Sequence, residues 1–261
     1  MKHIFLVLSF SLIFGGCASL NQPQTQIQGL IYWDEPASEE IFNRSIKKDF
    51  FKLSNYFETQ SNRLYCGPTT ATIVLNALRA RKAKEIPVDP TVLMSSEKKF
   101  LPKGFNPSYP QYTQRNVFTP VAKKKGLKSK AQVLGQPVDG KKDFGFQLRQ
   151  YAEFLKAHDL QVEFYVIDEK SDRKSLKQKI IENLGRRDDY VLINYKRSAL
   201  GQEGGGHFSP LGAYDKKTDR FLIMDVKADK YTWVWATSEQ VFKAMGTFDT
   251  TENRGLLLVS E

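Results

Sequence analysis

The chain has 261 residues and a formal net charge of +10, with 41% hydrophobic residues, 26% charged residues and two cysteines. This length suits one large domain or two small ones. The basic residues are spread along the chain, often beside acidic ones, whereas a nucleic-acid-binding protein would gather them on one face or in a recognised motif. The charge pattern therefore indicates a solvated basic surface, with binding of a small anionic substrate as the alternative.

The N-terminus has the pattern of an export signal. Lys2 and His3 precede thirteen mostly apolar residues, IFLVLSFSLIFGG, which are too few for a bilayer span of about 20 residues but typical of a signal peptide. Small residues then precede Cys17, which predicts a bacterial lipoprotein signal over residues 1–16 with lipid attached to Cys17. Phe14 stands where Leu is more usual, so an uncleaved anchor and a simple signal peptide are the alternatives. We expect an exported protein, either anchored to a membrane or free in the periplasm or medium.

Residues 17–45 are predicted to be a tether, because they are rich in Gln, Asn, Pro and Ser and show little apolar periodicity. Residues 46–261 are predicted to form one domain. Once Cys17 is lipidated, Cys66 is the one cysteine left, which rules out an internal disulfide framework.

The first part of this domain is predicted to be helical and rich in loops. Apolar residues at helical spacing predict a helix over residues 67–82, and Pro68 is acceptable in its first turn. Residues 84–140, rich in Pro, Gly and Lys, are predicted to form loops and short helices. An amphipathic helix is predicted over 145–158 and a further helix over 172–184.

Strands are predicted mainly in the second part. In chain order they are QVEFYVI (161–167), YVLINY (190–195), HFSPLGAY (207–214), FLIMDV (221–226) and RGLLLVS (254–260). The short segment DKKTDR joins the third and fourth as a hairpin, and residues 237–246 are predicted to be a short helix. Helices followed by an antiparallel sheet predict an α+β fold.

Cys66, His207 and Asp225 have the residue types and positions of a nucleophile, its base and an orienting acid. Cys66 lies at the predicted start of a helix, where free N–H groups and the helix dipole favour the thiolate. His207 opens one hairpin strand and Asp225 ends the facing one, so the register brings both to the same open end of the sheet. Asp225 would then accept the imidazole N–H and fix the tautomer of His207. An inert core thiol and a buried structural histidine are the alternatives.

Gln60 precedes Cys66 by six residues and is placed to donate its side-chain amide to an oxyanion, together with the backbone N–H of Cys66. Cys66 and His207 are 141 residues apart, within the papain-like separation of roughly 130–150 residues. The local papain signature CGSCW is absent.

The stretches QSNRLYCG, YVLINYKRSALGQEGGGHFSPLGAYDKKTDRFLIMDV, DKYTWVW and AMGTFDTTENRGLLLVS resemble the phytochelatin synthases, especially the short bacterial kind, from about residue 50 onward. The resemblance implies a papain-like cysteine protease fold, in which the helical part carries the Cys and an antiparallel sheet carries the His and Asp. It also implies cleavage of glutathione at its Cys–Gly bond through a γ-glutamylcysteinyl thioester on Cys66. Glycine leaves, and water or a second glutathione takes the acyl group. By this resemblance His207 is the general base and acid, Asp225 the orienter and Gln60 the oxyanion donor.

Two further residues match the family's grip on the γ-glutamyl group. Asp249 would pair with its α-amino group and Arg254 with its α-carboxylate, since a zwitterion needs one fixed charge of each sign and Arg offers a bidentate fork. The alternatives are a turn cap for Asp249 and a structural salt bridge for Arg254. His158 is expected to be structural or solvent-facing.

The expected partners follow from the same resemblance. Glutathione is the donor and an acceptor, no nucleic acid is expected, a membrane is reached through the lipid anchor, and a homodimer is expected. No cofactor is required, and a soft divalent metal (Cd²⁺ or Zn²⁺) is expected to activate through metal–thiolate glutathione. The sequence has no Cys/His cluster at metal-ligand spacing and lacks the cysteine-rich C-terminal half of the long plant-type synthases. A stoichiometric metal-sequestering role is therefore poorly supported.

Two other functions stay open at this point. The first is a papain-like peptidase that acts on other peptides, since such families also place a glutamine six residues before the cysteine. The second is a catalytically silent lipoprotein that binds thiol peptides or metal. Cleavage of α-linked peptides would select the first, and glutathione binding that survives Cys66→Ala would select the second.

Overall fold

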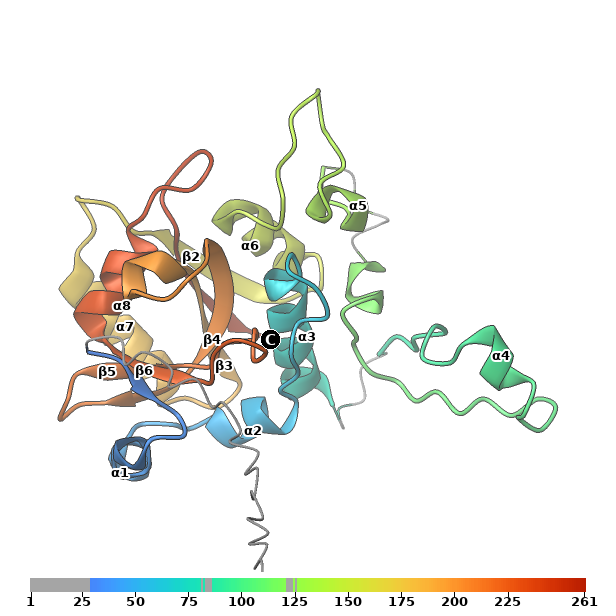
Figure 1. Ribbon diagram of the computed structural model, residues 1–261, viewed down its shortest axis with the longest axis horizontal. Helices are drawn as coiled ribbons and strands as arrows, with labels where there is room; N and C mark the ends of the chain where they lie inside the picture. Colours follow the sequence, from blue (N-terminus) through green and yellow to red (C-terminus); the bar gives the residue numbers. More distant parts are fainter. Residues whose placement is uncertain (1–28, 81, 83–85, 121–123, 125) are drawn as a thin grey trace, which may run out of the picture.

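The fold is built on a seven-stranded antiparallel sheet with the strand order β1-β6-β5-β4-β3-β7-β2. Figure 1 shows this sheet with helices packed around it. The strands are β1 (Ile31–Tyr32), β2 (Gln161–Val166), β3 (Asp189–Lys196), β4 (Gly206–Asp215), β5 (Arg220–Ile223), β6 (Val234–Thr237) and β7 (Gly255–Ser260). Together with the helices they confirm the predicted α+β class.

The structure is a computed structural model that describes residues 29–80, 82, 86–120, 124 and 126–261. The predicted signal peptide, Cys17 and the beginning of the predicted tether lie outside these residues. Within the described ranges, none of the helices has both the length and the apolar character needed to cross a bilayer.

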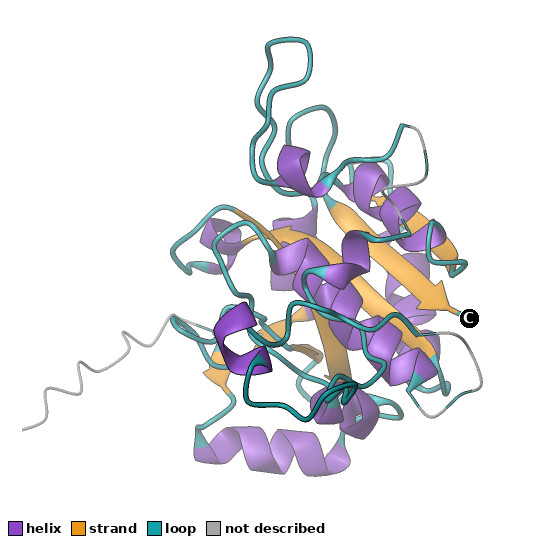
Figure 2. Cartoon of the chain, turned by 90° about the vertical axis from the view of Figure 1, so that its right-hand side faces the viewer, coloured by secondary structure: helices purple, strands orange, loops and turns teal. Residues whose placement is uncertain are grey.

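Helices cover both faces of the sheet (Figures 1 and 2). They are α1 (Pro36–Arg44), α2 (Phe50–Asn55), α3 (Cys66–Arg79), α4 (Ser95–Lys98), α5 (Lys130–Val133), α6 (Leu148–Lys156), α7 (Arg173–Leu184) and α8 (Ser238–Met245), with 3-10 turns η1 (Asn116–Phe118) and η3 (Arg197–Leu200). Helices α3 and α6 contact one side of the sheet, and α7 and α8 contact the other.

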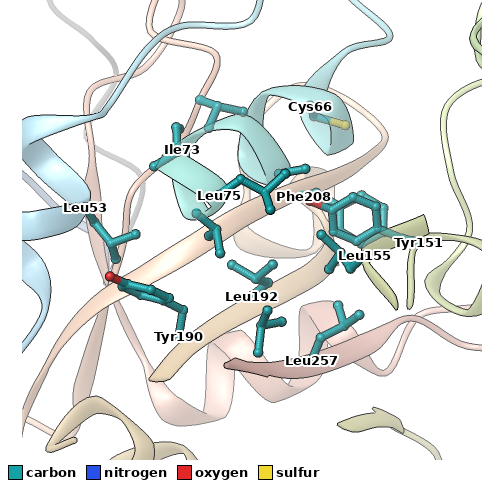
Figure 3. Packing of buried hydrophobic residues seen from close by; sticks show 14 of the residues in the cluster. Leu53, Cys66, Ile73, Leu75, Tyr151, Leu155, Tyr190, Leu192, Phe208 and Leu257 are labelled. Carbon is teal, nitrogen blue, oxygen red and sulfur yellow. The ribbon is translucent and has the colours of Figure 1, made fainter. Parts of the chain in front are cut away.

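The alternation of side chains along β3 explains the two covered faces. Tyr190 and Leu192 belong to the core beneath α3 and α6, whereas Val191 and Ile193 belong to the core beneath α7 and α8. Successive residues of a strand point to opposite faces, so a strand with a continuous apolar run such as residues 190–193 needs a cover on both. Figure 3 shows the first core, in which Leu192 lies below the α3 side chains.

The prediction of an unstructured tether is wrong from residue 30 onward. Residues 31–32 form the edge strand β1 beside β6, and residues 36–44 form α1. Tyr32 and Ile41 are buried, and the hydroxyl of Ser38 accepts a hydrogen bond of 2.9 Å from the indole of Trp235. These contacts join the segment to a strand about 200 residues further along the chain, which no local pattern reveals.

The predicted helices and strands of the domain are confirmed, with boundaries shifted by one to three residues. The amphipathic helix α6 begins at Leu148 and not at residue 145, because Gly145 has a φ of 68°, outside the helical region. Strand β5 ends at Ile223 and not at residue 226. A bulge between Leu211 and Ala213 of β4 precedes the point where Asp225 leaves the ladder.

Candidate active site

Cys66 is the first residue of α3, as the sequence predicts, and its side chain lies among the aromatic residues of the neighbouring elements (Figure 3). The hydroxyl of Tyr151, from α6, donates to the carbonyl oxygen of Gly67 at 2.8 Å. A Cβ atom on Gly67 would lie 2.9 Å from the ring of Phe146. Glycine after the cysteine therefore allows the residues at the start of α6 to pack directly against the N-terminus of α3.

The surroundings of Cys66 favour the thiolate. Burial raises the pKa of the thiol, but the charge of His207, a hydrogen bond with that imidazole and the backbone N–H groups of Phe208 and Gly67 together lower it below its usual value. A thiol at the start of a helix with such neighbours is typical of a reactive, nucleophilic cysteine. The sulfur atom is the centre of the candidate site.

His207 is the second residue of β4 and lies opposite Tyr195 of β3. Its Nε2 atom is 3.0 Å from Oδ1 of Asp225, which leaves the other ring nitrogen, Nδ1, for the hydrogen bond between His207 and Cys66. Burial lowers the pKa of His207, but the Asp225 carboxylate and the Cys66 thiolate raise it above its usual value. The structure thus brings His207 and Asp225 together across the hairpin.

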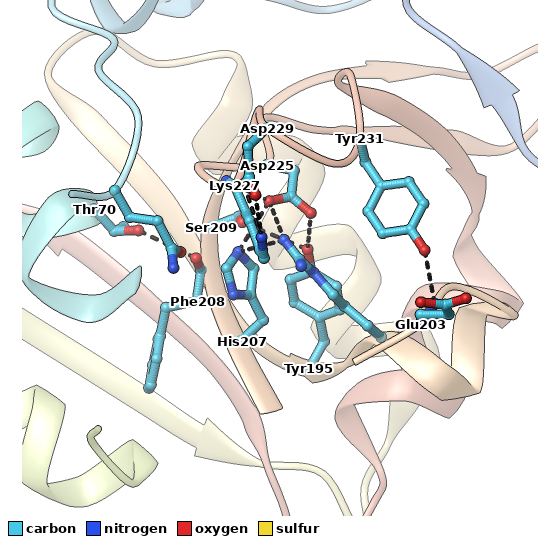
Figure 4. Close-up of polar contacts among 12 residues, drawn as sticks. Thr70, Tyr195, Glu203, His207, Phe208, Ser209, Asp225, Lys227, Asp229 and Tyr231 are labelled. Atoms are coloured by element: carbon cyan, nitrogen blue, oxygen red, sulfur yellow. Dashed lines mark hydrogen bonds and ion pairs between the residues drawn. The ribbon is translucent and has the colours of Figure 1, made fainter. Parts of the chain in front are cut away.

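Asp225 is fully buried and receives hydrogen bonds from four donors (Figure 4). These are the Tyr195 hydroxyl at 3.2 Å, the Lys227 backbone N–H at 2.8 Å, His207 Nε2 at 3.0 Å and the guanidinium of Arg197. Burial raises the pKa of this carboxyl, but His207 and the other donors hold it well below its usual range. The carboxylate is therefore ionised and fixed in orientation.

Arg197 was not singled out from the sequence. It begins η3, directly after β3, and 3% of its side chain is exposed. Its Nη2 atom contacts Oδ1 of Asp225 and lies 3.0 Å from Nε2 of His207. The sequence does show an arginine between a predicted strand and the glycine run. Its position in the sequence does not reveal that its charge is buried.

The glycine run before His207 makes room for two arginines. A Cβ atom on Gly204 would lie 3.2 Å from Cδ of Arg197, and one on Gly206 would lie 2.8 Å from Nη2 of Arg254. Gly205 has open space around the same position. Gly204 also has a φ of 127°, which other residues rarely adopt, and Gly206 leaves the space that the end of the Arg254 side chain occupies.

Gln60 lies beside the end of the hairpin, where its backbone N–H donates to the carbonyl oxygen of Val226 at 2.8 Å. Its Nε2 atom donates to the Asn62 carbonyl oxygen at 2.7 Å. A primary amide carries two N–H donors, so one remains for another acceptor. The side chain of Gln114 holds the backbone on both sides of Gln60, accepting from Ser61 N at 2.8 Å and donating to Thr59 O at 2.8 Å.

Asp249 and Arg254 form an ion pair with each other at 2.9 Å. Arg254 also donates to the carbonyl oxygen of Phe248 at 2.5 Å and packs over Gly206, next to His207. Its Nε atom is buried and has no hydrogen-bond partner among the residues that the structure describes. The pair places one charge of each sign close to the start of β4.

Among the residues that the structure describes, no cluster of three or more His, Cys, Asp or Glu side chains is arranged to hold a metal ion. The chemistry that the described groups can perform is acyl transfer. A thiolate can attack a carbonyl carbon, and the imidazole beside it can move a proton to and from the groups that leave and enter.

Comparison with known proteins agrees with these features. Residues 23–256 match the family model described as phytochelatin synthase. Curated relatives include glutathione gamma-glutamylcysteinyltransferase 3 of Lotus japonicus (28% identical over 224 residues, 85% of this chain and 40% of the relative) and glutathione gamma-glutamylcysteinyltransferase 1 of Arabidopsis thaliana (28% over 226 residues, 84% and 39%). A third, from Schizosaccharomyces pombe, is 24% identical over 237 residues, 87% of this chain and 48% of the relative. The chain spans less than half of the length of these relatives.

Proposed function

The chain belongs to the phytochelatin synthase family, and on that premise we propose that it is a cysteine-dependent acyltransferase or hydrolase that cleaves glutathione at the Cys–Gly bond. The observation that carries the proposal is the buried Cys66 thiol with its lowered pKa beside His207, whose pKa is raised. The names of the relatives supply the substrate class. The arrangement of Cys on a helix start and His and Asp on a sheet supports a papain-like fold.

In the proposed first step, the Cys66 thiolate attacks the carbonyl carbon of the cysteinyl residue of glutathione. The oxyanion that forms is stabilised by backbone N–H at the start of α3 and by the free amide N–H of Gln60. The C–N bond then breaks, and the His207 imidazolium gives its proton to the departing glycine amine. A γ-glutamylcysteinyl thioester remains on Cys66.

In the proposed second step, water or the α-amino group of a second glutathione attacks the thioester carbonyl. His207 takes the proton of the attacking group, and the Cys66 thiolate leaves. Asp225 keeps the Nε2–H of His207 oriented throughout, so that Nδ1 always faces the sulfur. The products are γ-glutamylcysteine after hydrolysis and a phytochelatin after transfer.

Asp249 and Arg254 are proposed to bind the γ-glutamyl head group. The two side chains form an ion pair with each other at 2.9 Å. A zwitterion with an α-amino group and an α-carboxylate offers each of them a partner of opposite charge. Substrate binding would then exchange one ion pair for two, with the bidentate guanidinium selecting the carboxylate.

The test is glycine release from glutathione by the domain without residues 1–28, followed by product analysis with and without Cd²⁺ or Zn²⁺. We expect release from the wild type and none above background from Cys66→Ala. An α-linked Glu-Cys-Gly peptide is the matched control substrate, and we expect it to be cleaved much more slowly. Equal release from Cys66→Ala, or equal cleavage of both peptides, would rule the proposal out.

We also propose that residues 1–16 direct export and that Cys17 carries lipid. The support is the sequence pattern of this region alone. Metabolic labelling of the full chain with a fatty-acid analogue should mark the wild type and not Cys17→Ala. Labelling of both forms, or of neither, would contradict a lipid at Cys17.

A further inference from the structure

The proposed mechanism gives no role to the guanidinium of Arg197, a buried charge that lies next to the reacting residues. The side chain is 3% exposed and reaches the junction between His207 and Asp225. A buried cation is costly unless it is paired. Here the partner is the same carboxylate oxygen, Oδ1 of Asp225, that faces Nε2 of His207.

The backbone around Arg197 holds the guanidinium at this place. Its N–H donates to the carbonyl oxygen of Gly205 at 3.1 Å, and its own carbonyl oxygen accepts from Gln202 N at 3.1 Å. Gly201 ends η3 in the left-handed region with a φ of 83°. The ring of Tyr231 lies against the guanidinium, with 5.6 Å between the ring centroid and Cζ of Arg197. The strand end, the turn and the following loop therefore all fix the side chain.

Nη2 of Arg197 and Nε2 of His207 are 3.0 Å apart, and both approach Oδ1 of Asp225. When the imidazole carries a proton on Nε2, both atoms are donors, so the contact between them is not a hydrogen bond. They share one acceptor instead. When His207 is an imidazolium, two positive groups stand side by side, and their repulsion opposes the attraction of each for Asp225.

We propose, on the basis of the proposed function, that Arg197 is a positioning residue that orients the Asp225 carboxylate and, through its fixed positive charge, weakens the hold of that carboxylate on the His207 proton. A carboxylate that faced the imidazolium alone would stabilise it more strongly. The imidazolium would then be a poorer acid toward the departing glycine amine. With Arg197 in place, Asp225 still orients the His207 ring, and the His207 imidazolium releases its proton more easily.

Other charged and titratable groups also face this cluster. From α3 and α6 they are Cys66 and Tyr151, from β3 Tyr195, and from the loop after β5 Lys227, Asp229, Lys230 and Tyr231. The side chains of Asp229 and Lys230 are exposed, and water and salt screen such charges. Arg197 is the buried cation that reaches Nε2 of His207.

The test is an NMR titration of the imidazole of His207 in a Cys66→Ala background, which removes the coupling to the thiol and needs no glutathione. The chain has three histidines, so ¹³C-labelled histidine gives few signals, and His207→Gln assigns the relevant one. Arg197→Met should raise the His207 midpoint by about one pH unit, as expected for loss of a neighbouring like charge. Asp225→Asn should shift it in the opposite direction.

The controls separate this role from a structural one. Arg79→Met removes another buried, ion-paired arginine, far from the site in the contact between α3 and Glu261, and should leave the His207 midpoint unchanged. In the Arg197 variants the His158 signal serves as an internal reference, because its imidazole contacts Tyr112 and Phe154. It is not a reference in Arg79→Met, because the charge of Arg79 lowers the pKa of His158. Arg197→Lys keeps the charge and should stay close to the wild-type midpoint.

An Arg197→Met variant that folds but leaves the His207 midpoint unchanged or lowers it would overturn the proposal. If this variant does not fold, Arg197→Gln gives the same test, since its neutral amide still donates to Asp225. The titration is independent of the proposed reaction. Absence of glycine release together with the expected midpoint shift would reject the glutathione activity and keep the electrostatic role of Arg197.

Discussion

Asp225 does more at its site than orient one imidazole. It accepts hydrogen bonds from His207, Arg197, Tyr195 and the backbone of Lys227. From sequence alone only the first of these partners was expected. Removal of the Asp225 carboxylate would leave the buried guanidinium of Arg197 without its counter-ion.

Asp225→Ala should therefore destabilise the protein by about 3–5 kcal/mol, the cost of breaking a buried ion pair from one side. Arg197→Met in the same chain should restore part of that loss, because it removes the unpaired charge. Denaturant unfolding of the two single variants and the double variant measures the coupling between the residues. Strict additivity of the two losses would show that the pair is not coupled.

For activity, the nearly isosteric Asp225→Asn is the better probe. It should release glycine more slowly than the wild type but faster than Cys66→Ala or His207→Ala, since Asp225 orients a group and makes no bond to substrate. Rates of glycine release at saturating glutathione give the ranking. Full activity of Asp225→Asn would contradict the assigned role.

The reacting residues could be predicted because each stands at a recognisable point of an element. Cys66 precedes an apolar helix pattern, and His207 and Asp225 stand at the open end of a hairpin whose turn sets the register. Arg197 could not be predicted in the same way. Its burial depends on the path of the chain through η3 and the glycine run, and neither has a periodic pattern.

Among the elements, the start of β4 shows how the glycine run serves the site. Gly206 leaves the space that the Arg254 guanidinium occupies, whereas Gly205 faces open space. These two adjacent glycines offer a matched pair for mutation. Comparison of the two alanine variants separates the need for space beside Arg254 from a general need for backbone flexibility.

Gly206→Ala should displace Arg254 and raise the KM for glutathione about tenfold, equivalent to about 1.4 kcal/mol of binding. Gly205→Ala should change KM little, because its Cβ meets no atom within 4 Å. Steady-state kinetics of glycine release gives both values. Equal effects of the two substitutions would mean that Arg254 does not bind substrate through this space.

The strands and long helices were predictable because their apolar residues repeat with a clear period. Residues 84–140 were not predictable beyond loops and short helices, and the described part of this segment has the short elements α4, η1 and α5. Strand β5 ends before residue 226, the end predicted for it, and the reason lies in the neighbouring strand rather than in the sequence of β5. The bulge in β4 shifts the register just before Asp225 leaves the ladder.

Across the whole molecule, two titratable groups, the partly buried Glu58 and the buried His158, should give opposite contributions to stability. Burial raises the pKa of the Glu58 carboxyl to about 7 from 4.5, and burial lowers the pKa of His158 to about 4 from 6.5. The Glu58 contribution is therefore present at low pH and lost as the pH rises toward 7. The His158 contribution is present above pH 6.5 and lost as the pH falls toward 4. Between these limits the two changes oppose each other.

Glu58→Gln should remove the contribution of Glu58 to the pH dependence of stability. The variant should be more stable than the wild type by about 2 kcal/mol at pH 7.5, and its stability should rise more steeply than that of the wild type between pH 4 and 6.5, because Glu58 no longer offsets the His158 contribution. Urea unfolding at several pH values measures both effects. Glu169→Gln, which changes an exposed carboxyl, is the control, and identical profiles for both variants would contradict the role of Glu58.

The order of the sheet was also beyond prediction from the sequence. Strand β1 has two residues and pairs with β6, while β7, the last strand, lies between β3 and β2. Pairings over such distances depend on which apolar faces must be covered, and a single strand does not carry that information.

The most direct test of the central claim is the mass of the intact protein after brief incubation with glutathione and acid quenching. A thioester at Cys66 predicts an added γ-glutamylcysteinyl group, absent from Cys66→Ala, removed by hydroxylamine and unaffected by a phosphine reductant. A mixed disulfide would instead add the whole of glutathione and disappear on reduction. Glycine release with no acyl group on Cys66, or only the reducible adduct, would contradict the account.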